Sequence, residues 1–165
     1  MVIEQKLEAM GLSLPPALQP PPGMKLPFAF VRVCGNRAYI AGHGPQNPDG
    51  LLVRTLGKVD AEVTAEEAYQ AARLTCLAML GSLKRELGDL DRVTAWLRVF
   101  GMVNSSPEFK LQPNVINGCS DLILELYGPV IGKHSRSAVG MAALPMGIPV
   151  EIEAEVEIDG DWVIG

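Results

Sequence analysis

The sequence is poor in the side chains that bind transition metals. It contains two histidines, His43 and His134, and three cysteines, Cys34, Cys76 and Cys119. The cysteines are odd in number and widely spaced, and none forms a C-x-x-C pair, so we expect free and mostly buried thiols. No acidic or thiol ligands cluster beside the histidines, and the sequence therefore gives little support to a metal site or a metal cofactor.

Two further absences narrow the possible locations and partners. No apolar run approaches the roughly 20 residues needed to span a bilayer, and the first residues carry Glu4, Lys6 and Glu8, unlike a signal peptide. We therefore expect a cytoplasmic protein without a membrane partner. The formal net charge is -5 and no long Lys/Arg run is present, which disfavours nucleic acid as a partner.

The chain is long enough and apolar enough for one globular domain. It has 165 residues, of which 48% are hydrophobic and 20% charged. Residues 2–11 predict a short amphipathic helix, and the prolines between Pro15 and Pro22 then exclude regular helix or central strand. We therefore divide the chain into an N-terminal helix with a proline-rich arm (residues 1–26) and a single domain (residues 27–165).

The remaining pattern predicts alternating strands and helices. Gly35-Asn36 separates two β-prone runs and predicts a hairpin. Thr64 and Glu67 have the spacing of a capping box at the start of a helix that would stop at Gly88. The expected elements are strands at 26–34, 37–41, 93–103, 137–144 and 150–158, and helices at 64–88 and 115–127. This β-β-α-β-α-β-β order predicts an α+β protein with one mixed sheet and two helices on one face.

Arg136 is the most prominent candidate for ligand binding. It directly precedes an apolar strand, where a guanidinium keeps its charge and offers a planar fork of donors to a carboxylate. A salt bridge to one of the protein's own acids explains the same placement equally well. The apolar strand that follows is too continuous for a solvent-facing strand, which indicates oligomerisation.

Four glutamates alternate with apolar residues near the carboxyl end: Glu151, Glu153, Glu155 and Glu157. In a strand they share one face, and most of them are explained by solvation. One that lies near Arg136 would be able to position a water molecule or act as a base, but periodicity does not select which. Asn117, near the start of the second helix, is better explained as a local cap than as a ligand contact.

Several of these segments together resemble a known family. Residues 136–145 (RSAVGMAALP) and 150–154 (VEIEA) resemble the carboxyl-terminal motif of the reactive-intermediate imine deaminases (RidA, or YjgF-like). Residues 35–42 (GNRAYIAG) are similar to that family's second strand, and Asn117 is similar to the asparagine that opens its second helix. The resemblance covers roughly residues 28–157.

The resemblance implies a chorismate-mutase-like α+β fold and a homotrimer with sites in clefts between subunits. It implies hydrolysis of small 2-imino or enamine carboxylic acids to 2-keto acids and ammonia, without a cofactor. Arg136 matches the arginine that binds the substrate carboxylate, and Glu151 matches the glutamate that positions the attacking water. Some members of the family carry an endoribonuclease or translation-inhibitor assignment, which the acidic balance of this chain disfavours.

Three presumed substrate-binding positions depart from the family pattern. Phe28 stands where a tyrosine is usual, Ala41 where a serine is usual, and Ala138 where a cysteine is usual. Each change removes a polar side-chain group, although the backbone carbonyl of Ala138 remains able to contact a ligand. These departures leave a second hypothesis open: a non-catalytic trimeric protein that binds small carboxylates.

Overall fold

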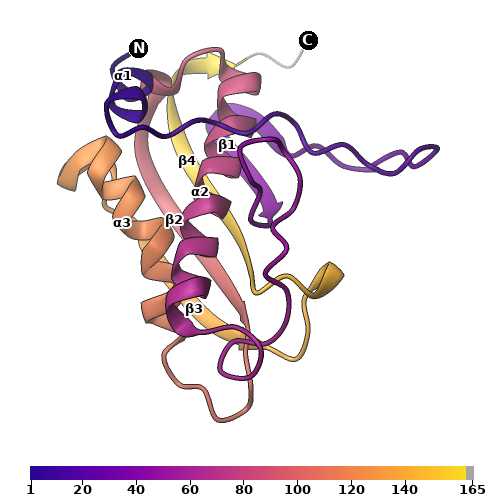
Figure 1. The fold of residues 1–165 in the computed structure, drawn as a ribbon. Helices are drawn as coiled ribbons and strands as arrows, with labels where there is room; N and C mark the ends of the chain where they lie inside the picture. Colours follow the sequence, from indigo (N-terminus) through magenta and orange to yellow (C-terminus); the bar gives the residue numbers. More distant parts are fainter. Residues whose placement is uncertain (163–165) are drawn as a thin grey trace.

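The computed structural model describes residues 1–162 and shows a mixed four-stranded sheet with helices (Figure 1). The sheet order is β1-β4-β2-β3, where β1 is Val31–His43, β2 Val93–Asn104, β3 Ser135–Met141 and β4 Val150–Trp162. Strands β2 and β3 are parallel, whereas β4 pairs antiparallel with both β1 and β2. The α+β fold class and the mixed sheet predicted from the sequence are confirmed.

The predicted hairpin lies within β1, which folds back on itself at Gly35-Asn36. The amide of Ala41 donates to the carbonyl of Phe30 at 2.9 Å, whereas eleven residues of straight strand would span about 36 Å. Gly35 has a φ of +58°, the left-handed conformation that a tight hairpin turn requires. The strands expected over 26–34 and 37–41 therefore correspond to the two arms of β1. The first arm is shorter than predicted, because it begins at Val31 and residues 26–30 lie outside the strand.

Two helices, α2 (Ala65–Leu87) and α3 (Gln112–Ile131), lie side by side on one face of the sheet (Figure 1). Helix α2 begins with the predicted capping box, because Thr64 Oγ1 accepts from the Glu67 amide at 3.1 Å and Glu67 Oε2 accepts from the Thr64 amide at 2.8 Å. Gly118 lets the helices approach closely, since a Cβ there would overlap the carbonyl oxygen of Tyr69. The predicted helix over 115–127 extends further in both directions, with non-helical backbone at Gly128.

The alternation in β4 separates the two faces of the sheet. Ile152, Ala154 and Val156 are buried under the helices, whereas the four glutamates are half-buried on the opposite face, as expected.

The strand predicted over residues 137–144 is shifted. It begins at Ser135 and ends at Met141, which is also where its pairing with the end of β2 stops.

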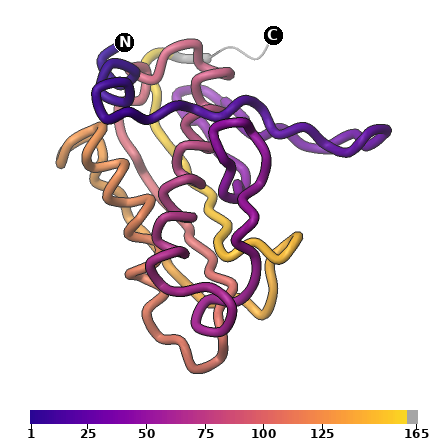
Figure 2. The backbone as a smooth tube through the Cα atoms, viewed as in Figure 1, coloured from indigo at the N-terminus to yellow at the C-terminus, as the bar shows by residue number. Residues whose placement is uncertain are grey.

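The segment before β1 combines a docked helix with an extended arm. Helix α1 (Val2–Ala9) buries Ile3 and Leu7 in the main core. The chain then crosses the body and runs out past it before returning to β1 (Figure 2). The base of this arm is anchored, because Arg85 Nη1 on α2 donates to the carbonyl of Pro15 at 3.1 Å. No helix within residues 1–162 is long and apolar enough to cross a membrane.

Candidate functional site

Arg136 lies on β3 and points toward α3. Its Nη1 donates to Asn117 Oδ1 at 2.8 Å and to Ser120 Oγ at 3.1 Å, and its Nη2 lies 3.4 Å from the carbonyl oxygen of Pro113. Asn117 therefore contacts Arg136, rather than serving as the local helix cap that sequence reasoning favoured. The fork of donors is held by three neutral acceptors from one helix.

His134 fixes the orientation of Ser120 in this arrangement. His134 Nδ1 lies 2.7 Å from the carbonyl of Gly132, which can only accept, so Nδ1 carries the ring proton. Nε2 then accepts from the hydroxyl of Ser120 at 2.9 Å, which leaves the lone pairs of Ser120 for Arg136. Burial lowers the pKa of His134, and the charge of Arg136 lowers it further. A neutral His134 thus orients Ser120 toward the guanidinium.

The charge of Arg136 is not neutralised within the described chain. Among residues 1–162 no carboxylate forms an ion pair with it. A guanidinium has five N–H donors, and the contacts above engage both on Nη1 and one on Nη2. The Nε–H and the second Nη2–H have no partner among the described residues and remain available to a carboxylate, which a guanidinium binds through charge-assisted hydrogen bonds.

Glu151 lies on the opposite face of the sheet, beside the end of β1. A Cβ at Gly42 would be 2.8 Å from Glu151 Oε2, so the missing side chain at Gly42 gives the carboxylate its place. Burial raises the pKa of Glu151, and the charge of Glu153 raises it further. Within the described residues the carboxylate has no hydrogen-bond or ion-pair partner. It is an uncommitted acceptor in a partly desolvated position.

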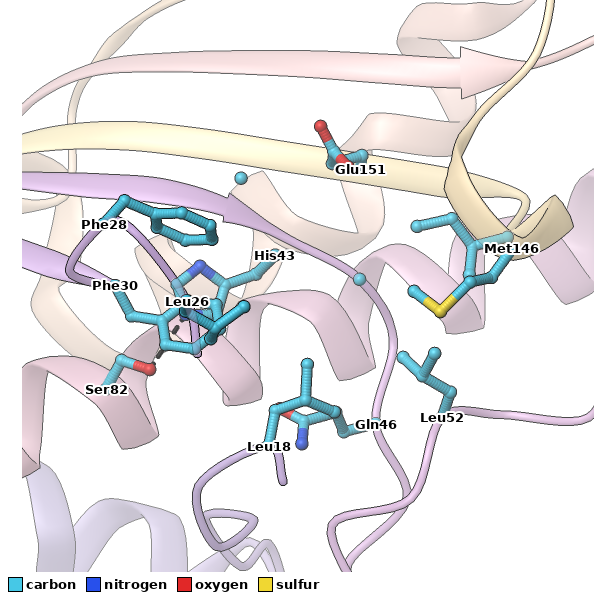
Figure 3. Close-up of a pocket in the computed structure, with 13 residues that line it drawn as sticks. Leu18, Leu26, Phe28, Phe30, His43, Gln46, Leu52, Ser82, Met146 and Glu151 are labelled. Carbon is cyan, nitrogen blue, oxygen red and sulfur yellow. Dashed lines mark hydrogen bonds between the residues drawn. The ribbon is translucent and has the colours of Figure 1, made fainter. Parts of the chain in front are cut away.

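Glu151 borders a cavity of about 200 Å³ at the β1 edge of the sheet (Figure 3). Phe28 also lines it and is 53% exposed, with its ring edge-on to Phe30 at 5.5 Å. The floor is a buried polar chain in which His43 Nδ1 donates to the carbonyl of Ala41 at 2.6 Å. Its Nε2 accepts from Ser82 Oγ at 2.8 Å, as the dashed line in Figure 3 marks.

This polar chain ends at a cation. Ser82 Oγ accepts from Arg85 Nη2 at 3.0 Å, on the same guanidinium that anchors the arm. Burial, together with the charge of Arg85, lowers the pKa of His43 to about 4, so the ring is neutral near pH 7. Sequence reasoning did not assign His43, Ser82 or Arg85 a role. No local pattern links His43 to a serine 39 positions away.

The candidate residues fall into two groups that a single chain keeps apart. Arg136, Asn117 and Ala138 lie on the α3 side of the edge strand, where Ala138 packs against the core. Glu151 and Phe28 lie at the β1 edge. Ala41 borders a separate shallow hollow with Glu153 and Glu155.

The strand register gives the scale of this separation. Arg136 aligns with Val99 of β2, which aligns with Ala154 of β4, three positions from Glu151. Two strand spacings and three residues of strand place the Cα atoms of Arg136 and Glu151 about 14 Å apart. Their side chains also leave opposite faces of the sheet. A small acid is too short to contact both residues within one chain.

One acidic group has the spacing of a cation site: Glu4, Asp89 and Asp91 are the only such cluster within residues 1–162. These carboxylates already have partners. Lys84 Nζ lies 2.7 Å from Glu4 Oε1, and the amide of Ile3 donates to Asp91 at 2.9 Å. The cluster ties α1 to the body and lies away from the candidate residues.

Comparison with known proteins identifies the family. The sequence model of the YjgF/chorismate-mutase-like, putative endoribonuclease family matches residues 4–151. The chain belongs to this family. The resemblance drawn from its motifs is therefore confirmed at the family level. Protein TCP17 of Trypanosoma cruzi is 36% identical over 157 residues, which cover 95% of this chain and 94% of that protein.

Solved structures of the family agree with the fold. The protein Atu1372 from Agrobacterium tumefaciens, described as having unknown function, is 37% identical with a TM-score of 0.84, covering 96% of this chain and 92% of that one. A putative endoribonuclease from Shewanella oneidensis MR-1 is 27% identical with a TM-score of 0.85, covering 96% and 100%. RidA from an Antarctic Psychrobacter is 20% identical with a TM-score of 0.55, covering 88% and 94%, and shares the fold.

Proposed function

We propose that this protein hydrolyses a small 2-imino or enamine carboxylic acid to a 2-keto acid and ammonia. The observation that carries the proposal is the state of Arg136. Its guanidinium is positioned by Asn117 and Ser120 and has no acidic partner among the described residues, where its Nε–H and one Nη2–H also have no partner. That arrangement suits a ligand carboxylate.

Besides an anchor for the substrate carboxylate, the reaction requires a positioned water molecule, and Glu151 meets this second requirement. A carboxylate with a raised pKa and no partner of its own accepts a hydrogen bond from a water molecule. This directs a lone pair of the water oxygen at C2 of the substrate. Attack forms the C–O bond while a water proton passes to Glu151. That proton passes on to the nitrogen, to which the electron pair of the C=N double bond has moved, and a tetrahedral carbinolamine results. The hydroxyl proton of the carbinolamine then moves to the nitrogen by way of Glu151, the C–N bond breaks, and ammonia leaves as the C2 carbonyl forms.

The separation of the two groups supports a site shared between subunits. Arg136 and Glu151 lie about 14 Å apart on opposite faces of one chain, so we propose that a second copy brings its Arg136 to the Glu151 of the first. A closed ring of copies, with the homotrimer as the proposed form, repeats this head-to-tail contact at every interface. The half-buried glutamate face of β4 lies on the side of the sheet that the helices leave open.

The test is release of keto acid and ammonia from imines generated in situ by an amino-acid oxidase. The protein should accelerate release above the spontaneous rate. Glu151→Gln should abolish the acceleration, whereas Glu155→Gln, on the same face of the same strand, should retain it. Equal turnover in the wild type and Glu151→Gln would contradict the assignment.

The apolar residues at Phe28 and Ala41 favour a second candidate, a non-catalytic protein that binds small carboxylates. Neither side chain supplies a hydrogen bond near Glu151. Under this alternative, 2-keto acids raise the melting temperature because they bind only the folded state, while no imine is hydrolysed faster than in buffer. Loss of that thermal shift in Arg136→Ala would place the acid at the same guanidinium.

A further inference from the structure

The cavity beside Glu151 is built for an apolar group. Its walls are hydrophobic side chains from four segments: Leu18, Leu26, Phe28, Phe30, Leu52 and Ile148. Figure 3 shows Leu18, Leu26, Phe28, Phe30 and Leu52 around one space, with Glu151 above its upper end. Met146 also borders the cavity from a backbone with φ of +58°. Such a conformation is costly for a residue other than glycine and is often found at binding sites.

The polar groups that line the cavity are already paired. His43 and Ser82 bond to each other and to Ala41 and Arg85, and Gln46 Nε2 donates to the carbonyl of Gly50 at 2.8 Å. These groups have little to offer a polar ligand. Glu151 is the only charged residue in the lining, and it lies at one end, so the rest of the cavity favours apolar contact.

The size of the cavity limits what it can hold. An apolar cavity of about 150 Å³ is large enough to bind benzene, and this one measures about 200 Å³. It therefore accommodates a phenyl ring or a branched alkyl group. The methyl group of an alanine-derived acid would leave most of it unfilled, and unfilled apolar space contributes no contact energy.

We propose that this cavity binds the side chain of the substrate, which is then a 2-imino or 2-keto acid bearing an aromatic or branched aliphatic group. The inference rests on the proposed function only in taking Glu151 as the reacting end. The cavity lies directly beside the Glu151 carboxylate. When C2 of the substrate is held at that carboxylate, the side chain of the substrate extends into the cavity.

The proline-rich arm contributes to this specificity because it supplies part of the cavity wall. Leu18 and Leu26 come from the arm, and the arm is fixed at its base by the Arg85 hydrogen bond to Pro15. Gly50 permits the close approach, since a Cβ there would lie 2.7 Å from Pro16 Cγ. The arm thereby forms one wall of the cavity and sets the size of the group it accepts.

The test compares phenylpyruvate with pyruvate as ligands of the intact protein, using isothermal titration calorimetry. Phenylpyruvate should bind at least tenfold more tightly, a difference typical of a filled apolar pocket. Leu26→Trp should fill the cavity and lower the affinity for phenylpyruvate at least tenfold, which removes this preference. Leu124→Trp, at an exposed position on α3, is the matched control and should keep the preference.

The outcomes separate this inference from the proposed reaction. Equal affinity for the two acids, or an unchanged preference in Leu26→Trp, overturns the cavity assignment even if imines are hydrolysed. Preferential binding of phenylpyruvate without hydrolysis of any imine supports the cavity assignment and contradicts the deaminase. Leu26→Ala provides a second variant, and its enlarged cavity should bind phenylpyruvate several-fold less tightly.

Discussion

Replacement of Arg136 gives the sharpest prediction about ligand binding. Arg136→Ala removes the two donors that have no partner among the described residues, on Nε and Nη2, together with the positive charge. Arg136→Lys keeps the charge but replaces the planar fork with a single ammonium, which Asn117 and Ser120 would also engage. The two variants therefore separate the contribution of charge from that of geometry.

The expected magnitude follows from the number of hydrogen bonds lost. A hydrogen bond to a charged group contributes about 1.5–3 kcal/mol. Because Arg136 is only half-buried, the lower value applies, and two such bonds amount to about 3 kcal/mol. Since each 1.4 kcal/mol is tenfold in affinity, Arg136→Ala should weaken binding of a 2-keto acid by about 100-fold. Arg136→Lys should weaken it by about tenfold.

Isothermal titration calorimetry with the purified variants measures both effects. Arg54→Ala, an exposed arginine elsewhere on the surface, should bind as tightly as the wild type. Thermal unfolding of each variant checks that the fold survives the loss of partners for Asn117 and Ser120. Unchanged affinity in a folded Arg136→Ala variant would refute the role of Arg136 as the carboxylate anchor.

Three further predictions concern titration and packing. Glu153→Gln removes a charge that raises the pKa of Glu151, so the acid limb of the turnover profile should move to lower pH, and an unmoved limb would contradict this. His43 has a folded pKa of about 4, below its unfolded value of about 6.5. Its stabilising contribution is therefore complete above pH 6.5 and is lost as pH falls toward 4. His43 should account for about 2 kcal/mol of the stability lost between pH 7 and pH 5, measured by urea unfolding as the difference between the wild type and His43→Asn; an equal loss in both would contradict this. Gly118→Ala would place a methyl group against the carbonyl of Tyr69 and should cost about 1–3 kcal/mol on unfolding; an unchanged melting temperature would disagree.

Local signals in the sequence were sufficient for much of the fold. The capping box at Thr64 and the hairpin turn at Gly35-Asn36 depend on residues within a few positions of one another, and both form as predicted. The predicted limits of β3 were wrong because the apolar run in the sequence does not show where the neighbouring strand, β2, ends. Pairing stops at Met141, opposite Asn104 at the end of β2.

The candidate site was less accessible to sequence reasoning. The four glutamates of β4 are equivalent by periodicity, and the family resemblance selected Glu151 from among them. The structure distinguishes Glu151 physically, because Gly42 makes room for its carboxylate beside the cavity. The supports of Arg136 combine Ser120 on α3 with His134 before β3, and such contacts arise only once the helix packs on the sheet.

The central claim is that Arg136 of one copy acts with Glu151 of another. Arg136→Ala and Glu151→Gln, each inactive alone, should regain activity when the two are mixed, dissociated and reassembled together. Random assortment in a ring gives intact Arg136 and Glu151 at about a quarter of the interfaces, so activity should return to about a quarter of the wild-type value. Reassembled mixed oligomers without activity would contradict the shared site.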